Sequence, residues 1–164
     1  MLFPRIETGF DLIDNLWQGF FKGRTYLLTG PLNSGKTTFC LQYAVKGLAC
    51  KERVVFFTKE RIDDILLAAE ALQLDIAAPI ENGEFLIYNL SENVSPISDE
   101  LIIKTIGEIS QIIEKEKPDR LIFDPITILL QFEDIDVLKQ KITELIYFWE
   151  KNEIDHAGNF RRTG

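Results

Sequence analysis

Thiols and imidazoles are scarce in this sequence of 164 residues, which contains two cysteines, Cys40 and Cys50, and one histidine, His156. Two cysteines are too few for a disulfide framework. A structural zinc site takes four nitrogen or sulfur ligands, and the three residues together cannot supply them. We therefore expect a reduced, cytoplasmic protein without structural zinc.

Long apolar runs are also missing. No stretch reaches the roughly 18 apolar residues that a membrane-spanning helix needs. The segment Met1 to Arg5 does not open a long apolar stretch followed by a small-residue cleavage site, so we expect no secretion signal. The sequence thus predicts no membrane partner.

Positive charge is in deficit, with 18 Lys and Arg against 26 Asp and Glu and a formal net charge of −8. Sequence-independent DNA binding depends on basic side chains that neutralise phosphates. The overall charge therefore makes DNA an unexpected partner, although a local basic patch stays open as an alternative.

Hydrophobic residues nevertheless make up 46% of the chain, enough for one globular core. Apolar runs predict four strands, at Thr25–Thr29, Arg53–Thr58, Glu84–Leu90 and Leu121–Asp124. Helical periodicity marks Lys36–Lys46, Ile62–Leu72, a helix from the N-cap Ser98 to Pro118, and Asp136–Glu150.

This alternation predicts an α/β fold, a three-layer parallel sheet with helices on both faces. We assign residues 1–150 to one domain. Residues 151–164 have almost no apolar periodicity, and we expect a polar tail that is disordered or truncated.

The strongest motif fits the pattern G-x-x-x-x-G-K-[ST] and lies between a predicted strand and a predicted helix. With one flanking threonine, it consists of Gly30, Pro31, Leu32, Asn33, Ser34, Gly35, Lys36, Thr37 and Thr38. The glycines let the backbone approach phosphates, and successive N–H groups with the helix N-terminus attract anions. Lys36 would reach the outer phosphates and Thr37 would ligate Mg²⁺. The alternative is a glycine-rich turn with an exposed lysine.

Two carboxylates follow predicted strands at their carboxyl ends, where open α/β sheets bind ligands. Asp124 ends the run Leu121–Asp124, and we predict that it completes the magnesium shell; the alternative is a turn or N-cap aspartate. Glu60 follows Thr58, and we predict that it polarises the attacking water. The alternative for Glu60 is a solvated Lys-Glu-Arg cluster.

The flanks of the motif resemble the RecA superfamily of P-loop ATPases, especially its KaiC and RadA branches. Thr8-Gly9-Phe10-Asp11 and the glycines that follow resemble the lead-in to the phosphate-loop strand, and Gln42 resembles a residue of the helix after the loop. Lys117–Asp124 is similar to the KaiC-type Walker B region. The resemblance covers roughly residues 5–150.

This resemblance implies ATP and Mg²⁺ as cofactors, self-assembly into rings or filaments, and hydrolysis at subunit interfaces. By position, Gly30–Thr38 would be the Walker A loop, Asp124 the Walker B aspartate, and Glu60 the acidic residue after the second strand, with Lys36 as its catalytic partner.

The sequence departs from the family in three respects, one of which is Pro125, at a position after Walker B that is commonly serine. Glu60 is flanked by Lys59 and Arg61 instead of a second acidic residue. The family sheet also continues with at least one strand after the helix that ends near Glu150, and no strand-like run follows here. We expect an empty strand position, with lower stability or compensating oligomer contacts.

These observations leave three hypotheses. The first is a KaiC-like, magnesium-dependent ATPase that hydrolyses ATP to ADP and phosphate. The second is a nucleotide-binding regulatory or scaffold module with little turnover, which the charged neighbours of Glu60 favour. The third is a RadA-like recombination accessory that binds DNA, which the acidic balance opposes.

Overall fold

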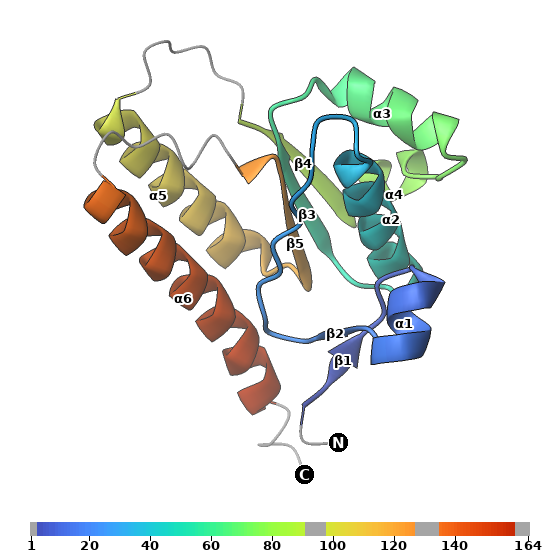
Figure 1. The fold of residues 1–164 in the computed structure, drawn as a ribbon, viewed down its shortest axis with the longest axis horizontal. Helices are drawn as coiled ribbons and strands as arrows, with labels where there is room; N and C mark the ends of the chain where they lie inside the picture. Colours follow the sequence, from blue (N-terminus) through green and yellow to red (C-terminus); the bar gives the residue numbers. More distant parts are fainter. Residues whose placement is uncertain (1–2, 91–97, 127–134, 160–164) are drawn as a thin grey trace. The chain divides into compact units, whose positions relative to one another are not determined.

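The structure, a computed structural model, describes residues 3–90, 98–126 and 135–159 (Figure 1). Its elements are, in chain order, β1 (Arg5–Ile6), α1 (Asp11–Trp17), β2 (Phe20–Phe21), α2 (Lys36–Ala49), β3 (Val54–Thr58), α3 (Ile62–Ala71), α4 (Ala77–Glu81), β4 (Phe85–Asn89), α5 (Asp99–Glu116), β5 (Arg120–Asp124) and α6 (Ile135–Asn159). The chain divides into two compact units. The first contains the five strands and α1 to α4, and the second contains α5 and α6.

A parallel sheet of order β4-β3-β5 forms the centre of the first unit. All five residues of β3 are buried, as expected for a strand covered on both faces. The register places Thr58 opposite both Asn89 and Asp124, so the last residues of the three strands lie side by side at the carboxyl end of the sheet. The predicted fold class is confirmed: the protein is α/β, with a parallel sheet flanked by helices.

The predicted strand Thr25–Thr29 is wrong, because residues 24–30 have no strand assignment in the structure. Within the described residues β5 is an edge strand, paired with β3 alone, and no strand follows it. A strand needs a neighbour that satisfies its backbone groups, and none pairs with this segment in the part described. Leu27 is therefore 73% exposed, in a run whose composition alone is typical of a buried strand.

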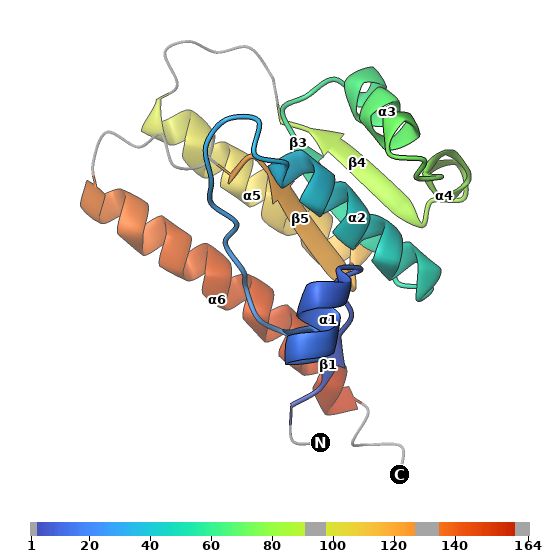
Figure 2. The ribbon, with the colours of Figure 1, turned by 45° about the vertical axis from the view of Figure 1, so that its right-hand side comes forward.

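Helix α2 lies against the sheet and supplies one side of the hydrophobic core (Figure 2). Its buried residues Leu41 and Ala44 belong to a cluster with residues of β3, α3, β4 and β5. Phe56 and Phe85 form a T-shaped, edge-to-face contact in this cluster, with ring centroids 6.0 Å apart. This packing fixes the direction of α2, and hence of the loop that precedes it.

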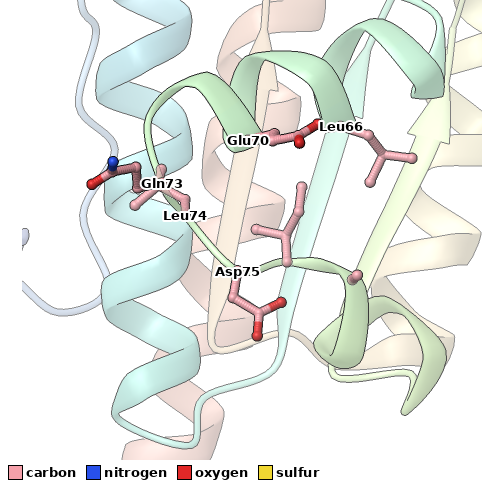
Figure 3. A pocket seen from close by; sticks show the side chains of 7 residues that line it. Leu66, Glu70, Gln73, Leu74 and Asp75 are labelled. Carbon is pink, nitrogen blue, oxygen red and sulfur yellow. The ribbon is translucent and has the colours of Figure 1, made fainter.

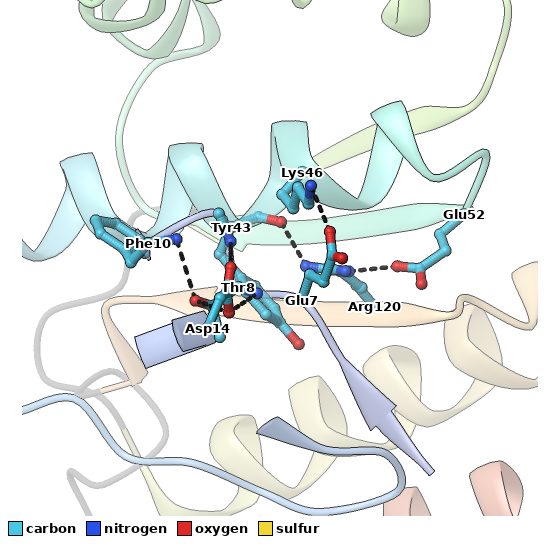
Figure 4. A network of polar contacts seen from close by, with 9 residues as sticks. Glu7, Thr8, Phe10, Asp14, Tyr43, Lys46, Glu52 and Arg120 are labelled. Carbon is cyan, nitrogen blue, oxygen red and sulfur yellow. Dashed lines mark hydrogen bonds and ion pairs between the residues drawn. The ribbon is translucent and has the colours of Figure 1, made fainter. Parts of the chain in front are cut away.

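The lead-in segment is held together by its own hydrogen bonds and contacts α2 through an ion pair between Glu7 and Lys46 (Figure 4) and through an aromatic stack. The Asp14 carboxylate accepts hydrogen bonds from the Thr8 N–H and hydroxyl, both at 2.8 Å, and from the Gly9 N–H at 3.0 Å. The Phe10 ring of the lead-in stacks on the Phe39 ring of α2, with centroids 4.3 Å apart. Helix α2, which starts at the phosphate loop, is therefore held both by the sheet and by the lead-in segment.

Helix α5 begins and ends where the sequence predicts. The Ser98 hydroxyl accepts a hydrogen bond from the Leu101 N–H, and the helix ends with Lys117 in the left-handed region, one residue before Pro118. Its buried residues, Ile102, Ile109 and Ile113, lie at helical spacing.

Helix α6 is longer than predicted, because it continues to Asn159 instead of ending near Glu150. Residues 151–159 of the predicted polar tail thus belong to α6, and residues 160–164 lie outside the described part. The extension holds no proline, the one residue type that would remove a helix hydrogen bond, so a polar sequence can continue the helix. None of the described helices combines the length and apolar character that crossing a bilayer requires.

Candidate functional site

The predicted phosphate loop forms an exposed turn that leads directly into α2, whose first residue is Lys36. Gly35, the N-cap, has φ +83°, a conformation that side chains with a Cβ rarely adopt. A Cβ on Gly30 would lie 2.7 Å from Ser34 Oγ, so a larger residue there would displace the Ser34 hydroxyl. The N–H groups of the first turn of a helix have no partners within the helix, and they carry its positive dipole end. A turn of this shape before a helix N-terminus is typical of an anion-binding site.

The Lys36 ammonium lies over this loop. Its Nζ donates to the carbonyl oxygens of Gly30, at 3.0 Å, and Pro31, at 2.6 Å, and to Ser34 Oγ at 3.3 Å. A lysine charge is therefore held at the turn where the helix dipole also points. When a nucleotide binds, its phosphate oxygens would replace the Gly30 and Pro31 carbonyl oxygens and Ser34 Oγ as acceptors for the Lys36 ammonium.

The remaining loop residues lie in the same turn and in the first turn of α2. They are Leu32, Asn33, Thr37 and Thr38. Leu32 is largely exposed, and Asn33 has φ +59°, in the left-handed region. The structure thus brings all nine predicted loop residues into one continuous segment.

Helix α2 presents its first turn toward the end of β5. Burial, together with the negative charge of Asp124, raises the pKa of the Cys40 thiol to about 12. The thiol therefore lies within electrostatic reach of the Asp124 carboxylate. Thr37 precedes Cys40 by three residues and therefore lies near its face of the helix.

Asp124 is the last residue of β5 and is 8% exposed. Its Oδ2 is buried and has no hydrogen-bond partner among the described residues. A buried carboxylate oxygen costs free energy unless a donor or a cation satisfies it, so this atom fits a metal ion. No group of three or more His, Cys, Asp and Glu gathers in the described residues. Magnesium does not need one, because it keeps waters and binds through one or two protein oxygens with substrate phosphates.

Glu60 lies two residues after β3, on an exposed turn at the same edge of the sheet. Its N–H donates to Thr58 Oγ1 at 3.0 Å, and its carbonyl oxygen accepts from Asn89 Nδ2 at 2.6 Å. The sequence analysis missed Thr58 and Asn89. In the sequence each is a polar residue at the end of an apolar strand. This pattern points to a contact with Glu60 only once the register of the strands is known.

A pocket of about 450 Å³ lies elsewhere in the first unit, between α3 and the start of α4 (Figure 3). It is lined by Leu66, Glu70, Gln73, Leu74, Asp75, Ile76 and Ala77. None of these residues belongs to the predicted site. The candidate site consists instead of the exposed phosphate loop, the exposed Glu60 and the buried Asp124 at the end of β5.

Comparison with known proteins gives the same family from sequence and from structure. The model of the family described as "ATPase: KaiC" matches residues 6–155. The circadian clock oscillator protein KaiC of Parathermosynechococcus lividus is 28% identical over 149 residues, which cover 87% of this chain and 28% of that protein. Its counterpart in Prochlorococcus marinus is 30% identical over 155 residues, 89% of this chain and 30% of that protein.

A crystal structure of a KaiC-like protein from Pyrococcus horikoshii OT3 superposes with a TM-score of 0.76. The two chains are 26% identical, and the match covers 92% of this chain and 69% of that one. The chain spans under a third of the length of the curated relatives described above. Since the family model covers nearly the whole chain, the protein belongs to the KaiC family of P-loop ATPases.

Proposed function

We propose that this protein binds ATP with Mg²⁺ and hydrolyses it to ADP and phosphate. The loop Gly30–Thr38 holds the phosphates, with Lys36 on the outer ones. Thr37 and Asp124 hold Mg²⁺, which when bound neutralises charge that develops on the phosphates. Glu60 accepts a hydrogen bond from the attacking water and directs it at the outer phosphate.

Two observations carry this proposal: an ammonium lies at a helix N-terminus, and the end of β5 holds a buried carboxylate oxygen that the described residues leave unsatisfied. Positive charge for phosphates and an oxygen for a cation are the two requirements of a nucleotide–magnesium complex. The family membership supports the same chemistry.

Turnover measured with and without Mg²⁺ tests the proposal. We expect phosphate release that depends on Mg²⁺ and falls at least about tenfold in Asp124→Asn and in Glu60→Gln, because both groups act on developing charge. Asp75→Asn, an exposed change at the separate pocket, is the matched control and should keep full activity. Turnover that Asp124→Asn leaves unchanged would rule out the metal role of Asp124.

A regulatory module with little turnover is the second candidate. Lys59 and Arg61 flank Glu60, where the family pattern has a second acidic residue. The Arg61 guanidinium contacts the Asp63 carboxylate at 3.4 Å, which draws it toward α3. Tight ATP binding with turnover no faster than in Glu60→Gln would favour this candidate over the ATPase.

Self-association into a ring or filament also belongs to the proposal. The family membership and the exposed apolar side chains of the first unit, among them Leu12, Leu16 and Trp17, support it. Mass measurement in solution with and without ATP and Mg²⁺ tests it. A monomer at about 50 μM under both conditions, where weak assembly is already populated, would contradict it.

A further inference from the structure

The peptide unit of Glu60 is held from two neighbouring strands. The Glu60 N–H donates to Thr58 Oγ1 of β3 at 3.0 Å, and the Glu60 carbonyl oxygen accepts from Asn89 Nδ2 of β4 at 2.6 Å. Thr58 is fully buried, and the register places it opposite Asn89. Two adjacent strands therefore fix the backbone of an exposed turn.

The chemistry of Asn89 suits this contact. A backbone carbonyl oxygen can only accept, so its partner must donate, and an amide side chain of this length supplies a donor where an aspartate or leucine would not. The ladder also continues past the strand end, because the Leu90 N–H donates to the Thr58 carbonyl oxygen at 2.6 Å. Asn89 thus stands on a backbone that is itself anchored to β3.

We propose that Asn89 is a positioning residue for Glu60, fixing from β4 the direction in which the Glu60 carboxylate points. The inference rests on the proposed function, in which Glu60 orients water. Without the Asn89 contact the turn would keep its Thr58 hydrogen bond but lose its link to β4. A carboxylate that must meet a water molecule within hydrogen-bond reach would then spend less time in the productive direction.

Steady-state kinetics with three variants test this role. Asn89→Leu has similar size and no donor, Asn89→Gln keeps the amide, and Asn82→Leu makes the same change at an exposed site before the opposite end of β4. We expect Asn89→Leu to lower kcat about tenfold with KM for ATP within about twofold, since orientation acts on the chemical step and not on binding. Asn89→Gln should recover part of the loss, and Asn82→Leu should match wild type.

The same substitution in a Glu60→Gln background separates positioning from a general structural effect. If Asn89 acts through Glu60, Asn89→Leu causes no further loss of kcat there. An equal fractional loss in both backgrounds, or an unchanged kcat in the single variant, would overturn the proposal.

Hydrogen exchange gives a readout that does not depend on turnover. The Glu60 amide should exchange at least about fivefold faster in Asn89→Leu than in wild type or Asn82→Leu, because the turn opens more often. Unchanged exchange would also overturn the role of Asn89. ATP binding that survives Lys36→Ala would instead refute the proposed function. Full turnover in Glu60→Gln would refute the role of Glu60. The failure of the Asn89 proposal is therefore distinguishable from the failure of the proposed function.

Discussion

Two helical glycines should respond in opposite directions to the same substitution. Gly47 lies in α2 and Gly107 in α5. Alanine is favoured over glycine in a helix interior by about 1 kcal/mol when nothing else changes. Apart from its own helix backbone, no atom of the described residues comes within 4 Å of a Cβ on Gly107, so Gly107→Ala should stabilise the protein by about 0.5–1 kcal/mol.

At Gly47 the new methyl group would meet Arg120. The added Cβ would lie 2.6 Å from Arg120 Cδ and 2.7 Å from its Nε. Arg120 is 1% exposed, and it cannot swing away easily because it pairs with the Glu52 carboxylate and donates to the Tyr43 carbonyl oxygen at 2.9 Å (Figure 4). Its guanidinium also lies over the Tyr43 ring, 4.4 Å from the centroid.

The net effect at Gly47 follows from comparing these terms. Forcing a methyl group into a packed site costs about 1–3 kcal/mol, and loosening a buried ion pair adds to this because breaking one costs about 3–5 kcal/mol. Against a helix gain of about 1 kcal/mol, we expect Gly47→Ala to destabilise by about 2 kcal/mol. Urea unfolding of both variants measures the difference. A Gly47→Ala midpoint at or above that of wild type would show that Arg120 is not confined as described.

Two further predictions concern titratable groups. Although desolvation raises it, hydrogen bonds from Thr8 and Gly9 hold the pKa of the Asp14 carboxyl below its ordinary value. The carboxylate thus contributes stability that is present above about pH 4, the ordinary aspartate pKa, and is lost as pH falls through its folded value. Asp14→Asn should therefore flatten the acid dependence of the urea midpoint, and an unchanged slope would contradict this. Burial and the charge of Asp124 raise the pKa of Cys40 to about 12. Iodoacetamide near pH 8 should therefore label the exposed Cys50 alone in the native protein, and both thiols in urea. Equal labelling of the two thiols in the native protein would refute the burial of the Cys40 thiol.

Local sequence signals predict the parts of this protein whose structure depends on neighbours along the chain. The loop Gly30–Thr38 is continuous, so the sequence identified its members and its place before α2 directly. Strand β3 was equally clear, because all its residues are buried and its composition is uniformly suited to that position.

Features that depend on distant partners were less accessible. The run Thr25–Thr29 has the composition of a strand, but strand formation requires a neighbour, and its apolar composition says nothing about whether one is present. The contacts of Thr58 and Asn89 with Glu60 likewise depend on the register of β3 and β4, which short apolar runs do not specify.

The central claim is that the turn before α2 binds the phosphates of ATP through Lys36. Calorimetric titration of ATP with Mg²⁺ into wild type, Lys36→Ala and the exposed control Lys51→Ala tests it directly. We expect Lys51→Ala to bind like wild type and Lys36→Ala to bind about 100-fold more weakly, because a hydrogen bond to a charged group is worth up to about 3 kcal/mol. Equal affinity in Lys36→Ala and wild type would contradict the account.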